Sequence, residues 1–209
     1  NNIFRHVRTV YGKTHKRAVS IEQIRAIEHL KLAKGSPLAL ARDLFMFSFY
    51  MRGMAFVDMA FLRKNDLRYG LVTYCRKKTN QCLAIEWEKP VQDIVNRYAG
   101  QIQDTPFMLP ILMNEDGTEY RRYRQMEQNI NRNLKKIGEK AGLRIPLTTY
   151  VARHSWASIA RNLDISLSVI SEGMGHNSYK TTQTYLNAID SSMITIANRK
   201  IIECVHGKL

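Results

Sequence analysis

Three side chains near the carboxyl end of the sequence have the types and the order needed to cut and rejoin a phosphodiester bond. Arg153 is followed 23 residues later by His176, and Tyr185 comes nine residues after the histidine. A guanidinium donates paired hydrogen bonds to phosphate oxygens and stays charged at any physiological pH. A phenol has a pKa of about 10, so fixed positive charge nearby favours the nucleophilic phenolate. These residues predict a transesterification at phosphorus.

The residues around these three are more specific than the spacing alone. Two further cations lie upstream, and the surrounding motifs read Phe49-Tyr-Met-Arg52-Gly-Met54 with Asp58 and Leu62 after it, Lys78-Thr79, Arg153-His-Ser-Trp-Ala157, Met174-Gly-His-Asn-Ser178 and Thr181-Thr-Gln-Thr-Tyr185. Taken together, they resemble the tyrosine recombinase (phage integrase) family over about residues 18–209. The resemblance implies a mainly α-helical catalytic domain with a small antiparallel β-sheet or hairpin.

The resemblance gives each of these residues a role that its chemistry supports. Arg52 and Arg153 would clamp the phosphate, where negative charge grows in the transition state. Tyr185 would be the nucleophile, forming a 3′-phosphotyrosyl bond and freeing a 5′-hydroxyl. Lys78 would protonate that leaving oxygen, and His176 would accept the tyrosine proton or donate to the phosphate. No cofactor and no metal ion are expected.

One position departs from the family pattern. The second box usually reads His-x-x-Arg, but here it reads Tyr150-Val-Ala-Arg153. A tyrosine can donate a hydrogen bond to phosphate, but it cannot act as a charged acid near neutral pH. Tyr150 is therefore predicted to touch the phosphate, with an altered rate or pH dependence.

Simpler interpretations exist for several of these residues. Arg52 could be a structural cation paired with Asp58, and Lys77 is an alternative to its neighbour Lys78. His154 could be a core or supporting histidine, and Trp156 could be a packing side chain. Tyr179 could compete with Tyr185 for the role of nucleophile.

Sequence patterns also predict the elements that must position these residues. Ser20 and Gln23 have the spacing of a capping box, which starts a helix at Ile21. An apolar run over 38–51 follows Pro37 and predicts a buried helix. Two runs of β-formers, 71–76 and 82–87, predict a hairpin with a basic tip. Further helices are expected from Pro90 to Tyr98, closed by Gly100, over about 121–140, and at roughly 148–163, 166–172, 179–187 and 190–204.

The charge balance favours a polyanionic partner. The 32 Lys and Arg residues outnumber the 18 Asp and Glu residues in this 209-residue chain, for a net charge of +14. Such an excess is typical of proteins that bind nucleic acid. The predicted DNA-contacting side chains are one lysine beside the proposed acid and six cations on the 121–140 helix: Lys77, Arg121, Arg122, Arg124, Arg132, Lys135 and Lys136.

The cysteines indicate the redox environment of the chain, and the residues at its amino terminus indicate its domain organisation. Cys75, Cys82 and Cys204 form no C-x-x-C pair, so neither a disulfide framework nor a zinc site is expected, and a reducing, cytoplasmic setting fits. No apolar window is long enough for a membrane span.

Residues 1–17 have five basic and no acidic side chains and begin with Asn1. They are predicted to be a basic linker, the tail of a missing DNA-binding domain, before a catalytic domain over 18–209.

The predicted function is site-specific recombination of double-stranded DNA by a bacterial mobile-element integrase. The resemblance implies a homotetramer on DNA, strand exchange through a Holliday junction and a carboxyl-terminal helix that packs on a neighbouring protomer, with a monomer expected in the absence of DNA. The alternatives are a type IB topoisomerase-like enzyme, a non-catalytic DNA-binding domain of the same fold and a metal-dependent nuclease.

Overall fold

The computed structural model describes residues 18–176, so the predicted linker, Tyr179, Tyr185 and the last two predicted helices lie outside the described residues. The elements follow in the order α1 Ile21–Glu28, α2 Pro37–Tyr50, α3 Phe56–Ala60, the 3₁₀ turn η1 Lys64–Asp66, β1 Leu67–Arg68, β2 Leu71–Cys75, β3 Cys82–Glu86, α4 Lys89–Arg97, α5 Ala99–Ile102, α6 Glu119–Lys140, α7 Thr149–Asn162 and α8 Leu167–Gly173. Helices dominate, and the predicted fold class is confirmed.

The first two helices begin where their capping residues predict. The Ser20 hydroxyl accepts a hydrogen bond from the Gln23 amide at 3.3 Å, and the Gln23 side chain accepts one from the Ser20 amide at 2.9 Å. At the start of α2 the Ser36 hydroxyl accepts a hydrogen bond from the Ala39 amide at 3.1 Å, with Pro37 in the first turn. This position suits proline because the first helical amides have no partner within the helix. The predicted capping box at Ser20 and the predicted position of Pro37 in the first turn of the next helix are both confirmed.

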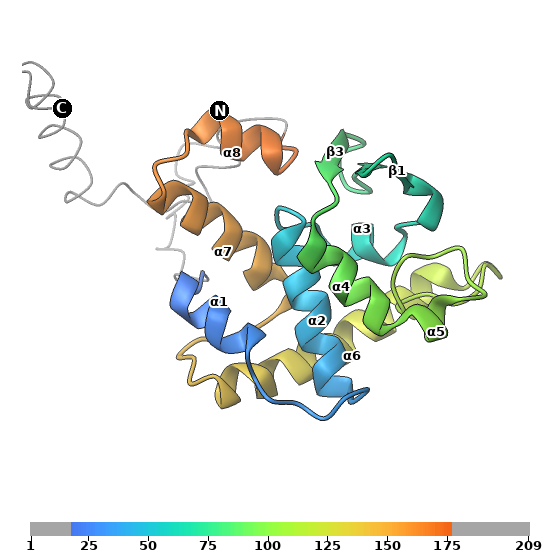
Figure 1. Ribbon diagram of the computed structural model, residues 1–209, viewed down its shortest axis with the longest axis horizontal. Helices are drawn as coiled ribbons and strands as arrows, with labels where there is room; N and C mark the ends of the chain where they lie inside the picture. Colours follow the sequence, from blue (N-terminus) through green and yellow to red (C-terminus); the bar gives the residue numbers. More distant parts are fainter. Residues whose placement is uncertain (1–17, 177–209) are drawn as a thin grey trace, which may run out of the picture.

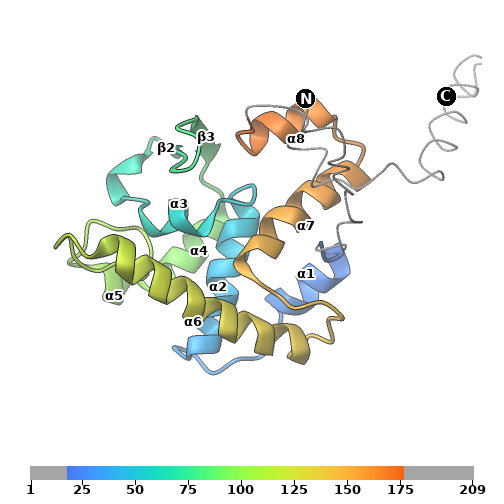
Figure 2. The same ribbon diagram turned by 180° about the vertical axis from the view of Figure 1, so that it is seen from behind.

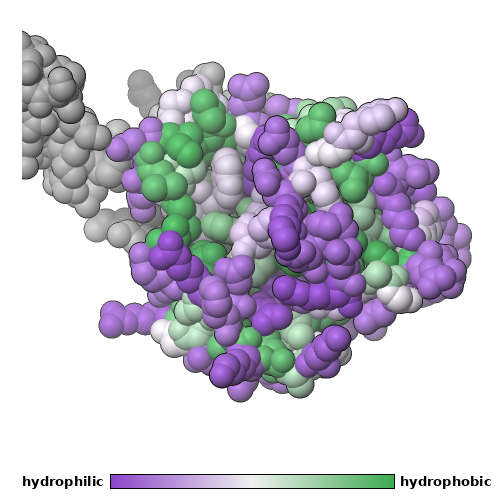
Figure 3. All heavy atoms as spheres, viewed as in Figure 1, coloured by the Kyte–Doolittle hydropathy of each residue, from purple (hydrophilic) through white to green (hydrophobic). Residues whose placement is uncertain are grey.

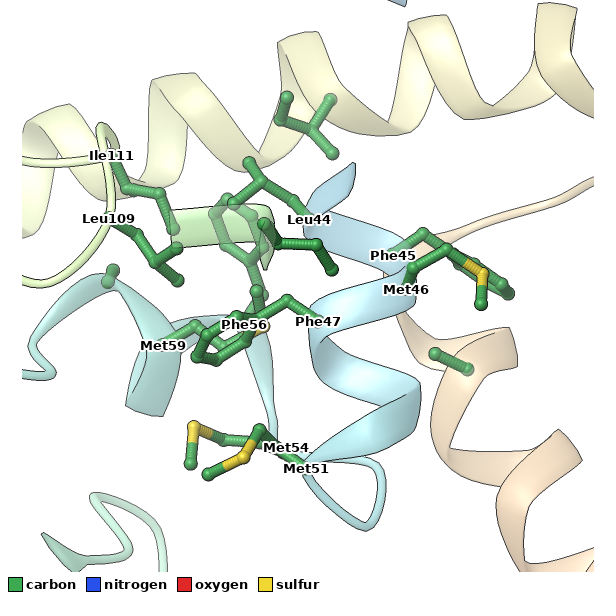
Figure 4. Close-up of a cluster of buried hydrophobic side chains, with 14 of the residues drawn as sticks. Leu44, Phe45, Met46, Phe47, Met51, Met54, Phe56, Met59, Leu109 and Ile111 are labelled. Carbon is green, nitrogen blue, oxygen red and sulfur yellow. The ribbon is translucent and has the colours of Figure 1, made fainter. Parts of the chain in front are cut away.

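Helix α2 is the central element of the main core. Its buried side chains pack with apolar residues of α3 and of the 107–112 segment, as Figure 4 shows for Phe47, Phe56 and Leu109. Helix α6 crosses α2 (Figure 1) and buries Ile130, Leu134 and Ile137 on its inward face. The predicted buried and amphipathic helices are both confirmed.

The sheet contains the predicted hairpin and one short strand that was not predicted. Its order is β1-β2-β3, with β2 and β3 antiparallel and Cys75 directly opposite Cys82. These two cysteines form a disulfide, with Cα atoms 3.8 Å apart, so the prediction of no disulfide is wrong here. The pairing register of the hairpin brings them together, which their spacing along the chain does not reveal. Cysteine use therefore gives no support for a reducing compartment.

Two short helices differ from the sequence prediction. Gly100 does not close the helix after Pro90, because α4 ends at Arg97 and Gly100 lies within α5. The buried α3 was also not predicted, since its five residues are too few to show helical periodicity.

Helices α7 and α8 build a second, smaller apolar cluster. It contains Ala157, Ala160, Ile170 and Met174, separate from the main core. Figure 1 and Figure 2 show α8 beside the carboxyl half of α7 and level with the β2–β3 hairpin, with the carboxyl end of α2 between the two. In Figure 3 apolar side chains gather on the face formed by α7 and α8, where Leu163, Ile165 and Val169 are exposed. Within residues 18–176, none of the helices has the length and apolar character to cross a membrane.

Candidate active site

Arg153 is the centre of the site that the fold assembles. It projects from α7 and is only 4% exposed, although it carries a full charge. Its Nη1 donates to the Gly53 carbonyl at 2.8 Å, and its Nη2 donates to the Met174 carbonyl at 2.6 Å. The same Nη2 lies 2.8 Å from His176 Nε2. One guanidinium therefore joins segments that are far apart in the chain: the turn after α2, helix α7 and the loop after α8.

The turn after α2 is shaped to meet Arg153. Arg52 and Gly53 both have positive φ, 56° and 71°, a conformation that costs a non-glycine residue energy and is retained where the surroundings require it. A Cβ on Gly53 would lie 2.6 Å from the Cα of Arg153, so only glycine fits this contact. A Cβ on Gly173 would lie 3.8 Å from Arg52 Cδ, which places the Arg52 side chain beside the end of α8. The two predicted clamp arginines are thus brought to one place.

His176 is a neutral acceptor in this arrangement. It is 9% exposed, and its amide donates to the Ser171 carbonyl at 3.0 Å, which continues the turn that ends α8. Because arginine has no acceptor, Nε2 of His176 must accept the hydrogen bond from Arg153, which leaves the proton on Nδ1. Burial, with the positive charges of Arg153 and Arg76, lowers the pKa of His176 to about 4.

The hairpin adds two buried residues that the sequence motifs did not include. Arg76 ends β2 and is 7% exposed, and its Nη1 donates to the Gly175 carbonyl beside His176. Its Nε lies 4.0 Å from Asp58 Oδ2, so Asp58 pairs with Arg76 and not with Arg52. Burial raises the pKa of Asp58, against the lowering effect of the Lys77 amide and the nearby cations. Burial and Asp58 also raise the pKa of Tyr74 to about 12, which makes this phenol a poor nucleophile.

The two candidate lysines occupy different environments in the turn between β2 and β3. The Lys77 amide donates to Asp58 Oδ1 at 2.8 Å, and its Nζ lies 4.7 Å from the centre of the Phe61 ring. A cation over an aromatic face is attracted to the ring. Lys78 is exposed on the same turn. The amine of Lys77 therefore contacts an aromatic ring, while both lysines are exposed on the turn.

Tyr150 lies in the first turn of α7, one helical turn before Arg153. It is 44% exposed, and its ring meets the His154 ring edge-to-face with centroids 4.5 Å apart. His154 is thus a supporting side chain that packs against Tyr150. Trp156 packs against the smaller apolar cluster, as its simpler interpretation requires.

The predicted DNA-contacting residues of α6 are not part of this cluster. Both views place α6 across α2 from α8 (Figure 1, Figure 2). Its amino-terminal end is linked to the hairpin by packing, because the Phe61 ring under Lys77 also lies 6.2 Å from the Tyr123 ring. Three of the basic residues have polar partners on the surface: Arg122 with Asp116 at 2.8 Å, Arg124 with Glu127 at 3.8 Å, and Arg132 with Asn129 at 2.6 Å.

Sequence reasoning did not assign Arg76 and Tyr74 to the site. Arg76 directly precedes the two lysines, so it read as one more cation at a basic hairpin tip. The strand pattern could have identified Arg76 as a buried residue. Residues 72, 74 and 76 alternate with exposed neighbours, so this arginine lies on the inward face of the strand.

Comparison with known proteins identifies the family of the chain. The model of the phage integrase family matches residues 20–191. The tyrosine recombinase XerA of Pyrococcus furiosus is 25% identical over 177 residues, which are 83% of this chain and 58% of that protein. The chain belongs to the phage integrase family, whose members are tyrosine recombinases.

Solved structures show the same fold. A crystal structure of XerA recombinase superimposes with a TM-score of 0.61 at 15% identity, covering 88% of this chain and 63% of the other. A lambda integrase (75–356) dimer bound to a COC′ core site gives 0.62 at 13% identity, covering 87% and 62%. The Tn1549 transposon integrase in complex with transposon right end DNA gives 0.61 at 12% identity, covering 92% and 69%. The chain thus spans less than two thirds of the length of the XerA and lambda integrase chains.

Proposed function

We propose that the chain is the catalytic part of a site-specific DNA recombinase, an integrase that moves a mobile element by cutting and rejoining double-stranded DNA. Family membership and the clustered cations support this proposal. The observation that carries it is Arg153, a buried guanidinium held by the turn of Arg52 on one side and by His176 on the other. A buried guanidinium of this kind suits an oxyanion.

In the proposed reaction the Tyr185 oxygen attacks the phosphorus of one strand. A bond from phosphorus to the tyrosine oxygen forms as the bond to the 5′ oxygen breaks. The tyrosine proton passes to His176, and Lys78 gives a proton to the leaving oxygen. The reverse reaction with the 5′-hydroxyl of another strand restores the phosphodiester, and since the ester conserves the bond energy no ATP is consumed. Arg52, Arg153 and Tyr150 bind the phosphate oxygens in both directions.

A neutral His176 is suited to the role of proton acceptor. Its pKa of about 4 keeps it unprotonated at neutral pH, so its Nε2 lone pair is available once Arg153 turns to the phosphate. A group with this pKa carries no proton to donate at neutral pH, and it is also a weak base, so the acceptor role requires the negative charge of the bound phosphate to raise the pKa of His176. Lys78, exposed on the hairpin turn, takes the acid role in this scheme.

The proposed partners follow from charge and family. The DNA duplex would be gripped by Lys77 and the basic residues of α6, through phosphate contacts that weaken steeply with salt. Solved relatives include a lambda integrase tetramer bound to a Holliday junction. We propose the same assembly here, with the segment after Tyr185 packing on a neighbouring protomer, residues 1–17 as a linker from a preceding domain, and a cytoplasmic location on bacterial DNA.

The test is a covalent trap. The full chain is incubated in EDTA with nicked duplexes that tile the DNA on either side of its gene, so that a cleaved strand loses its short end and cannot rejoin. Peptide mapping is expected to find a phosphotyrosyl peptide containing Tyr185, and Tyr185→Phe is expected to bind the same duplex without forming the adduct. An adduct that needs a divalent ion, or one on another tyrosine, would contradict the proposal.

A second assay separates the related enzymes. Supercoiled plasmids with one or two copies of the trapped site are expected to yield recombinant circles only when two sites are present. Relaxation of plasmids without any recombinant would instead indicate a topoisomerase. Binding without an adduct on any duplex would indicate a non-catalytic DNA-binding domain.

A further inference from the structure

Arg76 is a buried cation whose backbone shapes the lysine-bearing turn. Its amide donates to the Gln81 carbonyl at 2.9 Å, and its carbonyl accepts from the Asn80 amide at 2.8 Å. Asn80 has a positive φ of 54°, which lets the turn close over these few residues. The backbone of Arg76 therefore fixes the base of the turn that presents Lys77 and Lys78.

The side chain of Arg76 reaches a different part of the site. Its Nη1 donates to the carbonyl of Gly175, 99 residues away in the chain and directly before His176. Gly175 has a φ of 63°, and a Cβ there would lie 2.9 Å from both Arg76 Cδ and Leu83 Cδ1. The loop that carries His176 is thus pressed against the hairpin, with the Arg76 side chain in the contact.

The counter-charge of Arg76 is loosely placed. Asp58 Oδ2 lies 4.0 Å from its Nε, and this buried Nε has no hydrogen-bond partner within residues 18–176. Asp58 is engaged instead by the Lys77 amide at 2.8 Å. A buried arginine held for stability alone would be expected to use more of its five donors on its carboxylate. Here the guanidinium is directed to the loop of His176.

We propose that Arg76 is a positioning residue: its side chain holds the His176 loop against the β2–β3 hairpin, so that His176 and Lys78 meet the same phosphate. The role of that phosphate rests on the function proposed above. The positioning does not, because it is a statement about the position and surroundings of His176 in the free protein.

The experiment uses variants that separate positioning from charge balance. Arg76→Met keeps the length of the side chain and removes its donors, and Arg76→Lys keeps the charge and one donating group. Arg76→Met with Asp58→Asn also removes the carboxylate that the single change leaves without its cation. The matched control is Arg97→Met, which takes a cation from another buried aspartate, Asp43, at 2.8 Å and lies outside the site.

The first measurement needs no DNA. Titration of the His176 ring by NMR is expected to give a midpoint of about 4 in the parent. Within residues 18–176, the charged groups known to act on this ring are Arg153, at 2.8 Å, and Arg76. In Arg76→Met and in the double variant the midpoint is expected to rise, because a cation is lost and the loop opens to water. Arg97→Met should leave it unchanged, and Arg76→Lys should lie between.

The second measurement is the single-turnover rate of adduct formation on the trapped duplex. Arg76→Met and the double variant are expected to cleave about 10- to 100-fold more slowly with little change in DNA affinity, the size of effect that a small displacement of a catalytic group produces. Arg76→Lys should recover part of the rate. An unmoved His176 midpoint, or a double variant that cleaves within about twofold of the parent, overturns the proposal. If the parent forms no adduct, the proposed function fails, and the titration still decides the role of Arg76.

Discussion

Two buried aspartates show how differently this fold treats its scaffold and its site. Asp43 in α2 is 2% exposed and is saturated: it accepts from Arg42 at 2.9 Å, Arg97 at 2.8 Å and the Tyr98 hydroxyl at 2.9 Å. Asp58 in α3 is 5% exposed, but it accepts one close hydrogen bond, from the Lys77 amide, and its cation stands 4.0 Å away.

This difference distinguishes the cluster around Asp43, which stabilises the fold, from the cluster around Asp58, which is suited to binding an anion. Around Asp43 both carboxylate oxygens accept close hydrogen bonds, and its two arginines are partly exposed to water, so the carboxylate ties α2 to α4 without burying their charge completely. Around Asp58 the two guanidiniums of Arg76 and Arg153 are themselves buried, and the carboxylate, whose pKa is raised by burial, lies 4.0 Å from Arg76. Two buried guanidiniums gathered at one place are the arrangement expected where an anion binds.

Replacing the saturated aspartate should have the largest effect on folding. Asp43→Asn is expected to lower the free energy of unfolding by about 2–4 kcal/mol, because Arg42, Arg97 and Tyr98 lose a charged acceptor. Denaturant titration measures this loss. Cleavage by the folded fraction should stay at the parent rate, and a variant as stable as the parent would contradict the account of Asp43 as a stabilising centre.

Acid should weaken the site more than the scaffold, through His176. Its folded pKa of about 4 lies below the ordinary value of 6.5, so the unfolded chain binds the proton more readily between these limits. The stability that this residue contributes is therefore complete above pH 6.5 and is lost as the pH falls toward 4. Unfolding free energies measured across this window should fall more steeply for the parent than for His176→Gln.

Equal slopes for those two proteins would show that His176 is not held neutral by its surroundings. The control is Asp43→Asn, which should keep the parent slope across the same window because it leaves His176 and its two neighbouring cations in place.

Replacing the unsaturated aspartate should have the smallest effect. Asp58→Asn keeps the acceptor for the Lys77 amide and removes a carboxylate whose raised pKa disfavours its charge in the fold, so the unfolding free energy should change by less than about 1 kcal/mol. Cleavage should fall less than about fivefold, the rate equivalent of that energy. If Asp58→Asn lowers the free energy of unfolding as much as Asp43→Asn does, the distinction between the two aspartates is wrong.

The sequence predicted most elements because local rules govern them. Ser20, Ser36 and Pro37 start helices by satisfying or omitting amides that a helix leaves free, and the hairpin runs show as β-formers on either side of a polar turn. The prediction was wrong at Cys75 and Cys82 and at Gly100, and it missed α3. These features depend on strand register and on tertiary packing, which no local pattern encodes.

The site divides in the same way. Arg52, Arg153 and His176 were chosen from the sequence because their chemistry and motifs point to phosphate, and the fold brings them together. Tyr185 stays a prediction, since it lies outside the described residues, and so do Lys78, Tyr150 and the basic residues of α6 as functional groups.

Residue chemistry alone therefore predicted which groups could act on a phosphate, and local patterns predicted most of the helices and the β2–β3 hairpin, because both depend on side chains and near neighbours. Tertiary structure alone decided that Asp58 faces Arg76, that His176 is an uncharged acceptor and that Gly53 must lack a side chain. These properties arise from burial and from contacts between segments about 100 residues apart, where removal from water sets the charge state and close packing sets the size.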